Sequence, residues 1–138
     1  MTFLVDTSVW SLALRRDAPA EVQVLMEALA GTEVVVTTGL VLQELLQGFN
    51  GPNATSAIVE RFRALALVQP DREDYIAAAE VRNTCRRAGV QIGTIDALIA
   101  QLCIRNDLTL LTTDQDVTHV AKHCKLKVWS PKSRTKRR

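Results

Sequence analysis

Short apolar runs without polar alternation recur along the chain, and segments with helical spacing separate them. Such runs are typical of strands that are buried on both faces of a parallel sheet. The expected strands are 3–5, 33–37, 67–69, 108–112 and 126–129, the last at an edge of the sheet. Strands that alternate with helices in this way predict an α/β fold with a mostly parallel central sheet and helices on both faces.

Capping residues and glycine stops set the expected bounds of the helices. Pro19 and Gly31 bound a helix over 20–30, and Asn53 caps a helix from 54 to about 66. An acid three residues after Asp71 predicts a capping box and a helix to about residue 88. Further helices are expected at 9–14, from Thr37 or Thr38 to Gly48, from a cap at Thr94, and at 114–122.

Acidic residues directly follow four of the apolar segments. Asp6 follows the run at 3–5, and Asp114 follows the run at 110–113. Glu44 and Asp96 follow the segments 40–43 and 93–95, which belong to expected helices. A carboxylate at the edge of a core is costly unless it is paired or holds a metal. Four such acids, spread over the whole chain, predict one convergent acidic pocket.

The expected topology brings these acids to one edge of the sheet. Sites in open α/β sheets gather outside the carboxyl ends of the strands. Asp6 and Asp114 lie at such ends. Glu44 and Asp96 are each expected within about one turn of a helix start. Because helix starts face the same edge, all four acids are expected on one side of the sheet.

Neighbouring carboxylates repel one another strongly unless cations lie between them. Oxygen ligands select Mg²⁺ or Mn²⁺ over zinc. Divalent ions bind a scissile phosphate, activate a water and stabilise the leaving oxygen without any histidine. The pocket therefore predicts phosphodiester hydrolysis, and the acids alone do not distinguish RNA from DNA. Flanking hydroxyls that can orient a carboxylate or contact a phosphate belong to Thr7, Ser8, Thr112 and Thr113.

Each acid also has a simpler structural interpretation. Asp6 can cap the helix that follows it, and leucines around Glu44 leave its orientation ambiguous. Asp96 has the strongest case, because its helix is almost wholly apolar and the first turn favours a negative charge. Asp114 and Asp116 are equal candidates on spacing alone.

Other ionisable residues are expected to have structural roles. His119 and His123 are four apart on an expected helix, but the H-E-x-x-H pattern is absent. The cysteines form no C-x-x-C pair and are expected to pack as small apolar residues: Cys85, Cys103 and Cys124. Three further acids are expected on a solvated helix face: Glu73, Asp74 and Glu80.

Charge is divided unevenly between the body and the C-terminal end. The formal net charge is +2 and the last seven residues contribute +5, so the body carries −3. The length fits a single domain, expected over 1–130, with 131–138 as a basic, disordered tail. An acidic body does not suit nucleic-acid binding through a broad basic surface. Without a signal peptide or membrane span, a cytoplasmic protein is expected.

Four segments in order resemble those of a PIN-domain ribonuclease, specifically a VapC-type toxin of a prokaryotic toxin–antitoxin pair. The segments are 3–10, 43–45, 95–100 and 110–116, and the resemblance covers residues 2–129. It implies a PIN-like three-layer sandwich. It also favours Glu44 as the second acid and Asp114 over Asp116 as the fourth. Val117 departs from the family, which often has an aromatic residue there.

The resemblance also implies an activity and its partners. It implies a Mg²⁺-dependent endoribonuclease, usually a homodimer, that cleaves loops of transfer or ribosomal RNA. A small VapB-type antitoxin would block the acidic pocket with its tail. The resemblance implies four catalytic acids, of which Asp6 and Asp96 are the first choice as metal ligands, followed by Glu44 and Asp114.

A non-enzymatic binding module is the rival interpretation. A phosphoacceptor receiver-like domain also places acids at strand ends, and one of its aspartates is phosphorylated. Such a domain needs a lysine near the end of a late strand. The nearest candidates, Lys122 and Lys125, come before an apolar strand rather than after it.

Overall fold

The computed structural model of the chain describes residues 1–131 of 138, so the expected disorder of the basic tail falls on residues that lie almost wholly outside it. The sheet has the order β3-β2-β1-β4-β5, and every neighbouring pair of strands is parallel. The prediction of a mostly parallel sheet is confirmed. The strands are β1 Thr2–Val5, β2 Val34–Thr37, β3 Ala66–Leu67, β4 Thr109–Leu111 and β5 Lys127–Val128.

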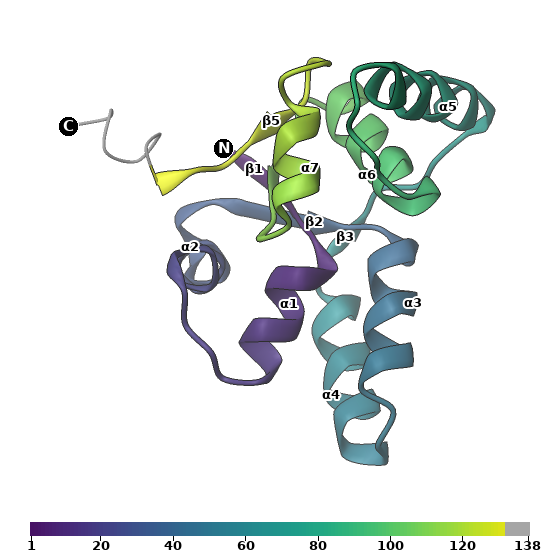
Figure 1. Cartoon of the computed structure of the whole chain (residues 1–138). Helices are drawn as coiled ribbons and strands as arrows, with labels where there is room; N and C mark the ends of the chain where they lie inside the picture. The colour runs from purple at the N-terminus through teal and green to yellow at the C-terminus, as the bar shows by residue number, and fades with distance from the viewer. Residues whose placement is uncertain (132–138) are drawn as a thin grey trace.

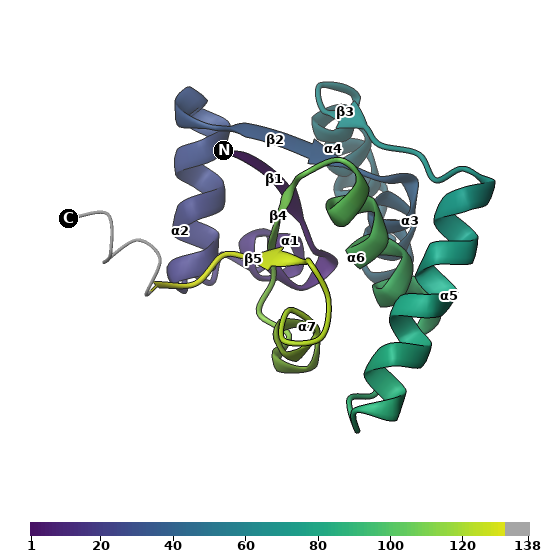
Figure 2. The ribbon, with the colours of Figure 1, turned by 90° about the horizontal axis from the view of Figure 1, so that it is seen from above.

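Helices cover both faces of this sheet, which makes three layers (Figure 1). Helices α1 to α4 lie below the sheet in that view, and α5 to α7 lie above it. The view from above shows α2 and the α5–α6 pair on opposite sides of the strands (Figure 2). The α-helices are α1 Thr7–Leu14, α2 Ala20–Glu27, α3 Gly39–Gly48, α4 Pro52–Arg63, α5 Arg72–Arg87, α6 Thr94–Arg105 and α7 Gln115–Val120.

The strand order reverses at β1, the first strand in the chain. Leu4 of β1 pairs with Val36 of β2 on one side and with Leu110 of β4 on the other. The chain runs from β1 outward to β2 and β3 and then returns to β4 and β5 on the other side of β1. In open α/β sheets the ligand crevice lies outside the carboxyl end of the strand at such a switch point. Asp6 follows β1 directly, which puts its carboxylate at this switch point.

The core is aliphatic and draws on both faces of the sheet. Leu4, Leu110 and Leu111 of the central strands are at most 1% exposed. Helices from opposite layers contribute equally buried side chains, among them Leu45 of α3 and Ile99 of α6. The expected pattern of strands buried on both faces is therefore confirmed for β1 and β4.

Two helix caps differ from the prediction. The helix assigned to a cap at Asn53 begins at Pro52, after Gly51, because proline suits the first helical position and its missing N–H costs nothing there. Thr94 is the first residue of α6 and its hydroxyl does not cap the helix; the cap position belongs to Gly93. The capping box of α5 is present as predicted, with Asp71 as the cap.

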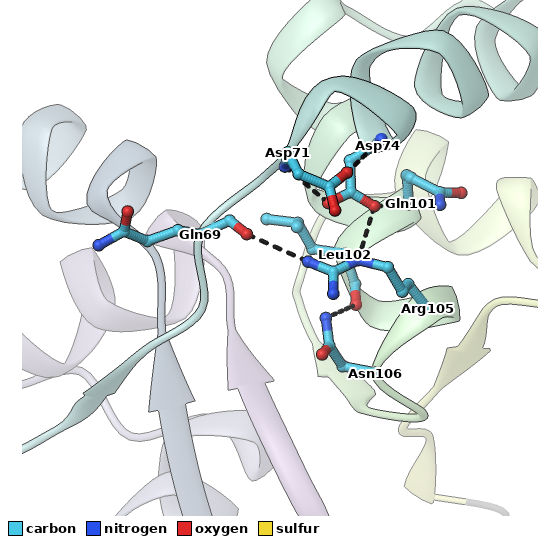
Figure 3. A network of polar contacts seen from close by, with 7 residues as sticks. All are labelled: Gln69, Asp71, Asp74, Gln101, Leu102, Arg105 and Asn106. Atoms are coloured by element: carbon cyan, nitrogen blue, oxygen red, sulfur yellow. Dashed lines mark hydrogen bonds and ion pairs between the residues drawn. The ribbon is translucent and has the colours of Figure 1, made fainter.

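Asp74 corrects a second expectation, because it is wholly buried rather than solvated. Its carboxylate accepts hydrogen bonds from Arg105 Nε at 2.7 Å, the Asp71 N–H at 3.0 Å and Gln101 Nε2 at 3.4 Å (Figure 3). Burial alone raises the pKa of Asp74, but these hydrogen bonds outweigh it and hold the pKa below its ordinary value. Asp74 thus ties the start of α5 to α6.

Candidate active site

Asp6 is the most firmly held of the acids at the carboxyl edge of the sheet. Its carboxylate accepts hydrogen bonds from the Thr7 N–H at 2.9 Å, Ser8 Oγ at 3.1 Å and Thr112 Oγ1 at 2.8 Å. The side chain is 8% exposed, and burial raises its pKa against the effect of these hydrogen bonds. Asp6 does cap α1, as its simpler interpretation required, but its second oxygen faces Thr112 of a different segment.

Thr112 connects Asp6 to Asp114. Its hydroxyl donates to Asp6 and accepts a hydrogen bond from the Asp114 N–H at 3.1 Å. Asp114 is the cap of α7, where its Oδ1 accepts the Asp116 N–H at 2.9 Å. Asp114 is half-buried on the rim, whereas Asp116 is exposed in the first turn of the helix.

Glu44 reaches the same region from α3. It lies in the second turn of that helix, later than the single turn expected from the sequence. The Thr7 hydroxyl donates to Glu44 Oε1 at 2.9 Å, and the side chain is half-buried. Thr7 therefore links Glu44 to the start of α1 beside Asp6, which resolves the ambiguous orientation of this residue.

Asp96 lies in the first turn of α6, on the other side of the sheet. Burial, and then the charges of Asp6, Asp114, Glu44 and Asp116 in that order, raise its pKa to about 6. A carboxyl that experiences the charges of the other acids lies in their common field. The structure thus brings the four predicted acids together at one edge, with Asp116 at its margin.

The remaining hydroxyls have distinct positions. Ser8 Oγ accepts the Thr113 N–H at 3.2 Å and so joins α1 to the segment after β4. Thr113 lines a cavity of about 610 Å³ that extends from this segment toward Trp129. Hydroxyls of Thr7, Ser8 and Thr112 orient carboxylates, and Thr113 borders the open space.

The donor set fits a hard divalent cation, because all four acids supply oxygen. Within residues 1–131, however, no three His, Cys, Asp or Glu side chains already form an arrangement that holds a metal ion. A bound Mg²⁺ or Mn²⁺ would be held by Asp6, Glu44, Asp96 and Asp114.

The other candidates from the sequence take no part. His119 and His123 are exposed, and α7 ends at Val120, so His123 does not share a helix face with His119 as expected. Lys122 and Lys125 are exposed in the turn before β5 and do not provide the strand-end lysine of a receiver. Of the cysteines, Cys85 and Cys103 are buried; Cys124 is half-buried.

Two arginines at a cavity beside the start of α6 did not stand out in the sequence. Arg82 and Arg86 line a cavity that reaches Gly93, the residue before α6. Their spacing of four residues on a helix is the signal that indicates a shared face. Nothing in the local sequence shows that this face lies beside Asp96.

No helix in the described part of the chain is long and apolar enough to cross a bilayer. A model of the PIN domain family matches residues 3–123. Solved structures share the fold over nearly the whole chain. VapBC2 from Rickettsia felis, bound to promoter DNA, matches with a TM-score of 0.74 and 21% identity over 94% of this chain and 100% of that chain.

FitAcB from Neisseria gonorrhoeae matches with a TM-score of 0.70 and 22% identity, over 94% of this chain and 97% of that chain. VapC20 from Mycobacterium tuberculosis, a toxin that cleaves the sarcin–ricin loop, matches with a TM-score of 0.65 and 20% identity, over 91% of this chain and 98% of that chain. These likenesses agree with the three-layer fold. Together with the family match over most of the chain, they show that this chain belongs to the PIN domain family.

Proposed function

We propose that the protein is a metal-dependent endoribonuclease and the toxin of a toxin–antitoxin pair. The observation that carries this proposal is the arrangement of four acids at the switch point of the sheet: Thr112 bridges Asp6 and Asp114, Thr7 holds Glu44 beside Asp6, and Asp96 lies in the first turn of α6. The family match and the likeness to VapC20, a toxin that cleaves an RNA loop, support RNA as the substrate.

The chain's own residues prepare this edge for phosphodiester hydrolysis. Three hydrogen bonds fix Asp6, and Thr7 fixes Glu44, so these carboxylates need little reorganisation when a ligand binds. A bound Mg²⁺ or Mn²⁺ would neutralise the carboxylates, polarise the phosphate and make a water more acidic. Attack of a water oxygen on phosphorus would break the P–O3′ bond, the water would lose one proton and the leaving 3′ oxygen would gain one, which gives a 5′-phosphate and a 3′-hydroxyl.

Asp114 and Asp96 come from different elements. Asp114 approaches from the segment after β4, and Asp96 from the first turn of α6. Asp116 lies at the margin of this group, because its side chain is exposed, its backbone N–H donates to Asp114, and its charge is the last of the four that raise the pKa of Asp96. We therefore assign the fourth catalytic acid to Asp114.

We infer a VapB-type antitoxin as the protein partner, because similar structures are VapBC and FitAB-type assemblies. An apolar hollow of about 240 Å³ between α1, α2 and α4 is a suitable surface for it. Met26 and Leu14 at this hollow are 52% and 40% exposed. Exposed apolar surface of this kind marks protein contacts.

We infer a homodimer from a second apolar surface. Tyr75 and Ile76 of α5 are each 57% exposed, and Ile95 of α6 is 40% exposed. A cytoplasmic location and a domain over 1–130 complete the proposal.

Sequencing of RNA ends after induced expression tests the proposed activity. Expression of the parent should produce new 5′-phosphate ends at defined positions in transfer or ribosomal RNA. Asp96→Asn, which keeps the size of the side chain and removes its charge, should produce none. Purified parent should cleave the same RNA in Mg²⁺ and stop when EDTA is added. Equal cleavage by the parent and Asp96→Asn would contradict the proposal.

A further inference from the structure

A cavity of about 450 Å³ lies beside the acidic edge, between the last turns of α5 and the connector that leads into α6. The two helices pack side by side in both views (Figures 1 and 2). Its lining residues are Arg82, Arg86, Val90, Gln91, Ile92 and Gly93. The cavity is therefore cationic, in contrast to the acids next to it.

Neither arginine of this cavity is neutralised by the described residues. The ion pairs among residues 1–131 involve Arg63, Arg105, Lys127 and the N-terminus, and none includes Arg82 or Arg86. Arg82 Nε donates to the Ile92 carbonyl at 3.0 Å, which fixes the half-buried side chain. Its two terminal nitrogens donate to no residue within 1–131.

Arg86 completes the pair one helical turn later. Its Nη2 donates to Asn83 Oδ1 at 3.1 Å, and the side chain is exposed. A neutral amide does not compensate the charge of a guanidinium. Two planar cations with free donors at one cavity match the oxygens of a phosphate.

Gly93 joins this cavity to the acidic site. It lines the cavity, and a Cβ at this position would lie 4.0 Å from Asp96 Oδ2. Gly93 thus belongs both to the wall of the cavity and to the surroundings of the Asp96 carboxylate.

We propose that Arg82 and Arg86 bind a backbone phosphate of the RNA that flanks the scissile phosphate, an inference that rests on the proposed nuclease activity. The need for such a site follows from charge, because the body of the chain carries −3 and repels a polyanion. A phosphate contact positions the strand without reading its bases. The arginine pair thus holds the RNA in register with the acids.

Arg87 provides a matched control on the same helix. It carries the same charge as Arg86, is equally exposed, and donates to Thr84 Oγ1 at 3.3 Å in the same local geometry. It does not line the cavity. Arg86→Gln and Arg87→Gln therefore change the net charge equally and differ only in position.

The test measures RNA binding by the full chain in an Asp96→Asn background, which prevents cleavage. Fluorescence anisotropy with a labelled single-stranded RNA, over a range of salt concentrations in Mg²⁺, gives the dissociation constant and its salt slope. Arg86→Gln should weaken binding about fivefold to tenfold and reduce the slope by about 0.7, the value for one phosphate contact to a single strand. Arg86→Lys should restore most of the slope and part of the affinity. Arg87→Gln should change the affinity by less than twofold.

Cleavage kinetics separate this proposal from the nuclease activity. In the active protein, Arg86→Gln should raise KM by a similar factor and change kcat little. If the parent cleaves RNA and Arg86→Gln equals Arg87→Gln in both assays, the phosphate site is wrong and the nuclease stands. If Arg86→Gln weakens the binding of a poly-glutamate peptide but not the binding of RNA, the cavity binds an acidic protein and the phosphate site is wrong. A parent that neither binds nor cleaves RNA overturns both proposals.

Discussion

The hydroxyl of Thr112 donates a 2.8 Å hydrogen bond to Asp6 Oδ2 and bridges two segments that are 106 residues apart. The same hydroxyl accepts the Asp114 N–H, so one oxygen sets the position of two acids. Groups that orient a metal ligand in this way affect activity without touching the substrate.

Replacement of Thr112 by valine tests this positioning role. Thr112→Val keeps the shape of the side chain but leaves Asp6 Oδ2 with Ser8 alone, so kcat for RNA cleavage should fall about tenfold to a hundredfold. Thr109→Val, the same change in the buried part of β4, is the control and should retain kcat within about twofold. Equal activity of the two variants would contradict a role for the Thr112 bridge.

Removal of either acid from the α7 segment tests the choice between Asp114 and Asp116. Asp114→Asn should lower kcat by at least about a hundredfold, because the carboxylate charge is lost at the site, while asparagine still caps the helix. Asp116→Asn should change kcat less than about threefold, since that side chain is exposed. Steady-state cleavage of one defined RNA measures both. A larger loss in Asp116→Asn would exchange the two roles.

Divalent cations should stabilise the parent more than its site variants. A ligand at a hundred times its dissociation constant adds about 2.7 kcal/mol to the free energy of unfolding. Mn²⁺ should therefore raise the Tm of the parent by several degrees, and isothermal titration should show binding. Asp6→Asn should lose most of both effects, because its carboxylate is the most firmly held of the four. Ca²⁺-free buffer with EDTA provides the reference melt.

The sequence predicts those features of the site that depend on residues close together in the chain, and it does not predict contacts between distant segments. Short apolar runs identify β1 and β4, and the acids that follow them necessarily lie at the carboxyl edge. The contact of Thr112 with Asp6 depends on the pairing of β1 with β4, which no local pattern specifies. The turn of Glu44 toward Thr7 likewise follows from how α3 packs against α1.

The solvated-face prediction failed for Asp74 alone, since Glu73 and Glu80 are exposed as expected. Local spacing does not distinguish Asp74 from its neighbour Glu73. Asp74 is buried because Arg105, 31 residues later, approaches from α6. The cavity lined by Arg82 and Arg86 was missed for the same reason, since its relation to Asp96 passes through the packing of α5 on α6.

The raised pKa of Asp96 predicts how stability depends on pH in the absence of metal. The carboxyl of Asp96 binds its proton more tightly in the folded protein than in the unfolded chain, where its pKa is 3.8. The contribution of this protonation to the free energy of unfolding is therefore fully present below pH 3.8. It is lost as pH rises through about 6. Asp96→Asn should therefore raise the Tm at pH 7.5 in EDTA by roughly 3 °C, about 1 kcal/mol after solvent screening.

The difference in Tm between Asp96→Asn and the parent should become smaller as the pH falls from 7.5 to 5, because Asp96 of the parent becomes protonated. Glu80→Gln, an exposed acid on α5, is the control and should show no such trend. Thermal melts by circular dichroism at several pH values measure both variants. A Tm difference that grows on acidification would contradict repulsion among the acids.

The lowered pKa of Asp74 predicts the opposite dependence of stability on pH, and Asp74 lies outside the proposed active site. Its pKa is lowered, so its contribution to stability is present above 3.8 and is lost only as pH falls through the lowered value. Asp74→Ala removes the capping contact to the Asp71 N–H and should lower the Tm by roughly 5 °C at pH 7, about 1–2 kcal/mol for the lost cap. Glu73→Ala, one residue earlier in the same first turn, should lower the Tm by less than about 2 °C.

The same two variants test whether Asp74 affects activity. At a temperature well below the Tm of both variants, kcat for RNA cleavage should be the same in the two, because the Asp74 contacts hold α5 to α6 rather than any of the proposed catalytic acids. A loss of kcat in Asp74→Ala alone would mean that this junction also positions Asp96.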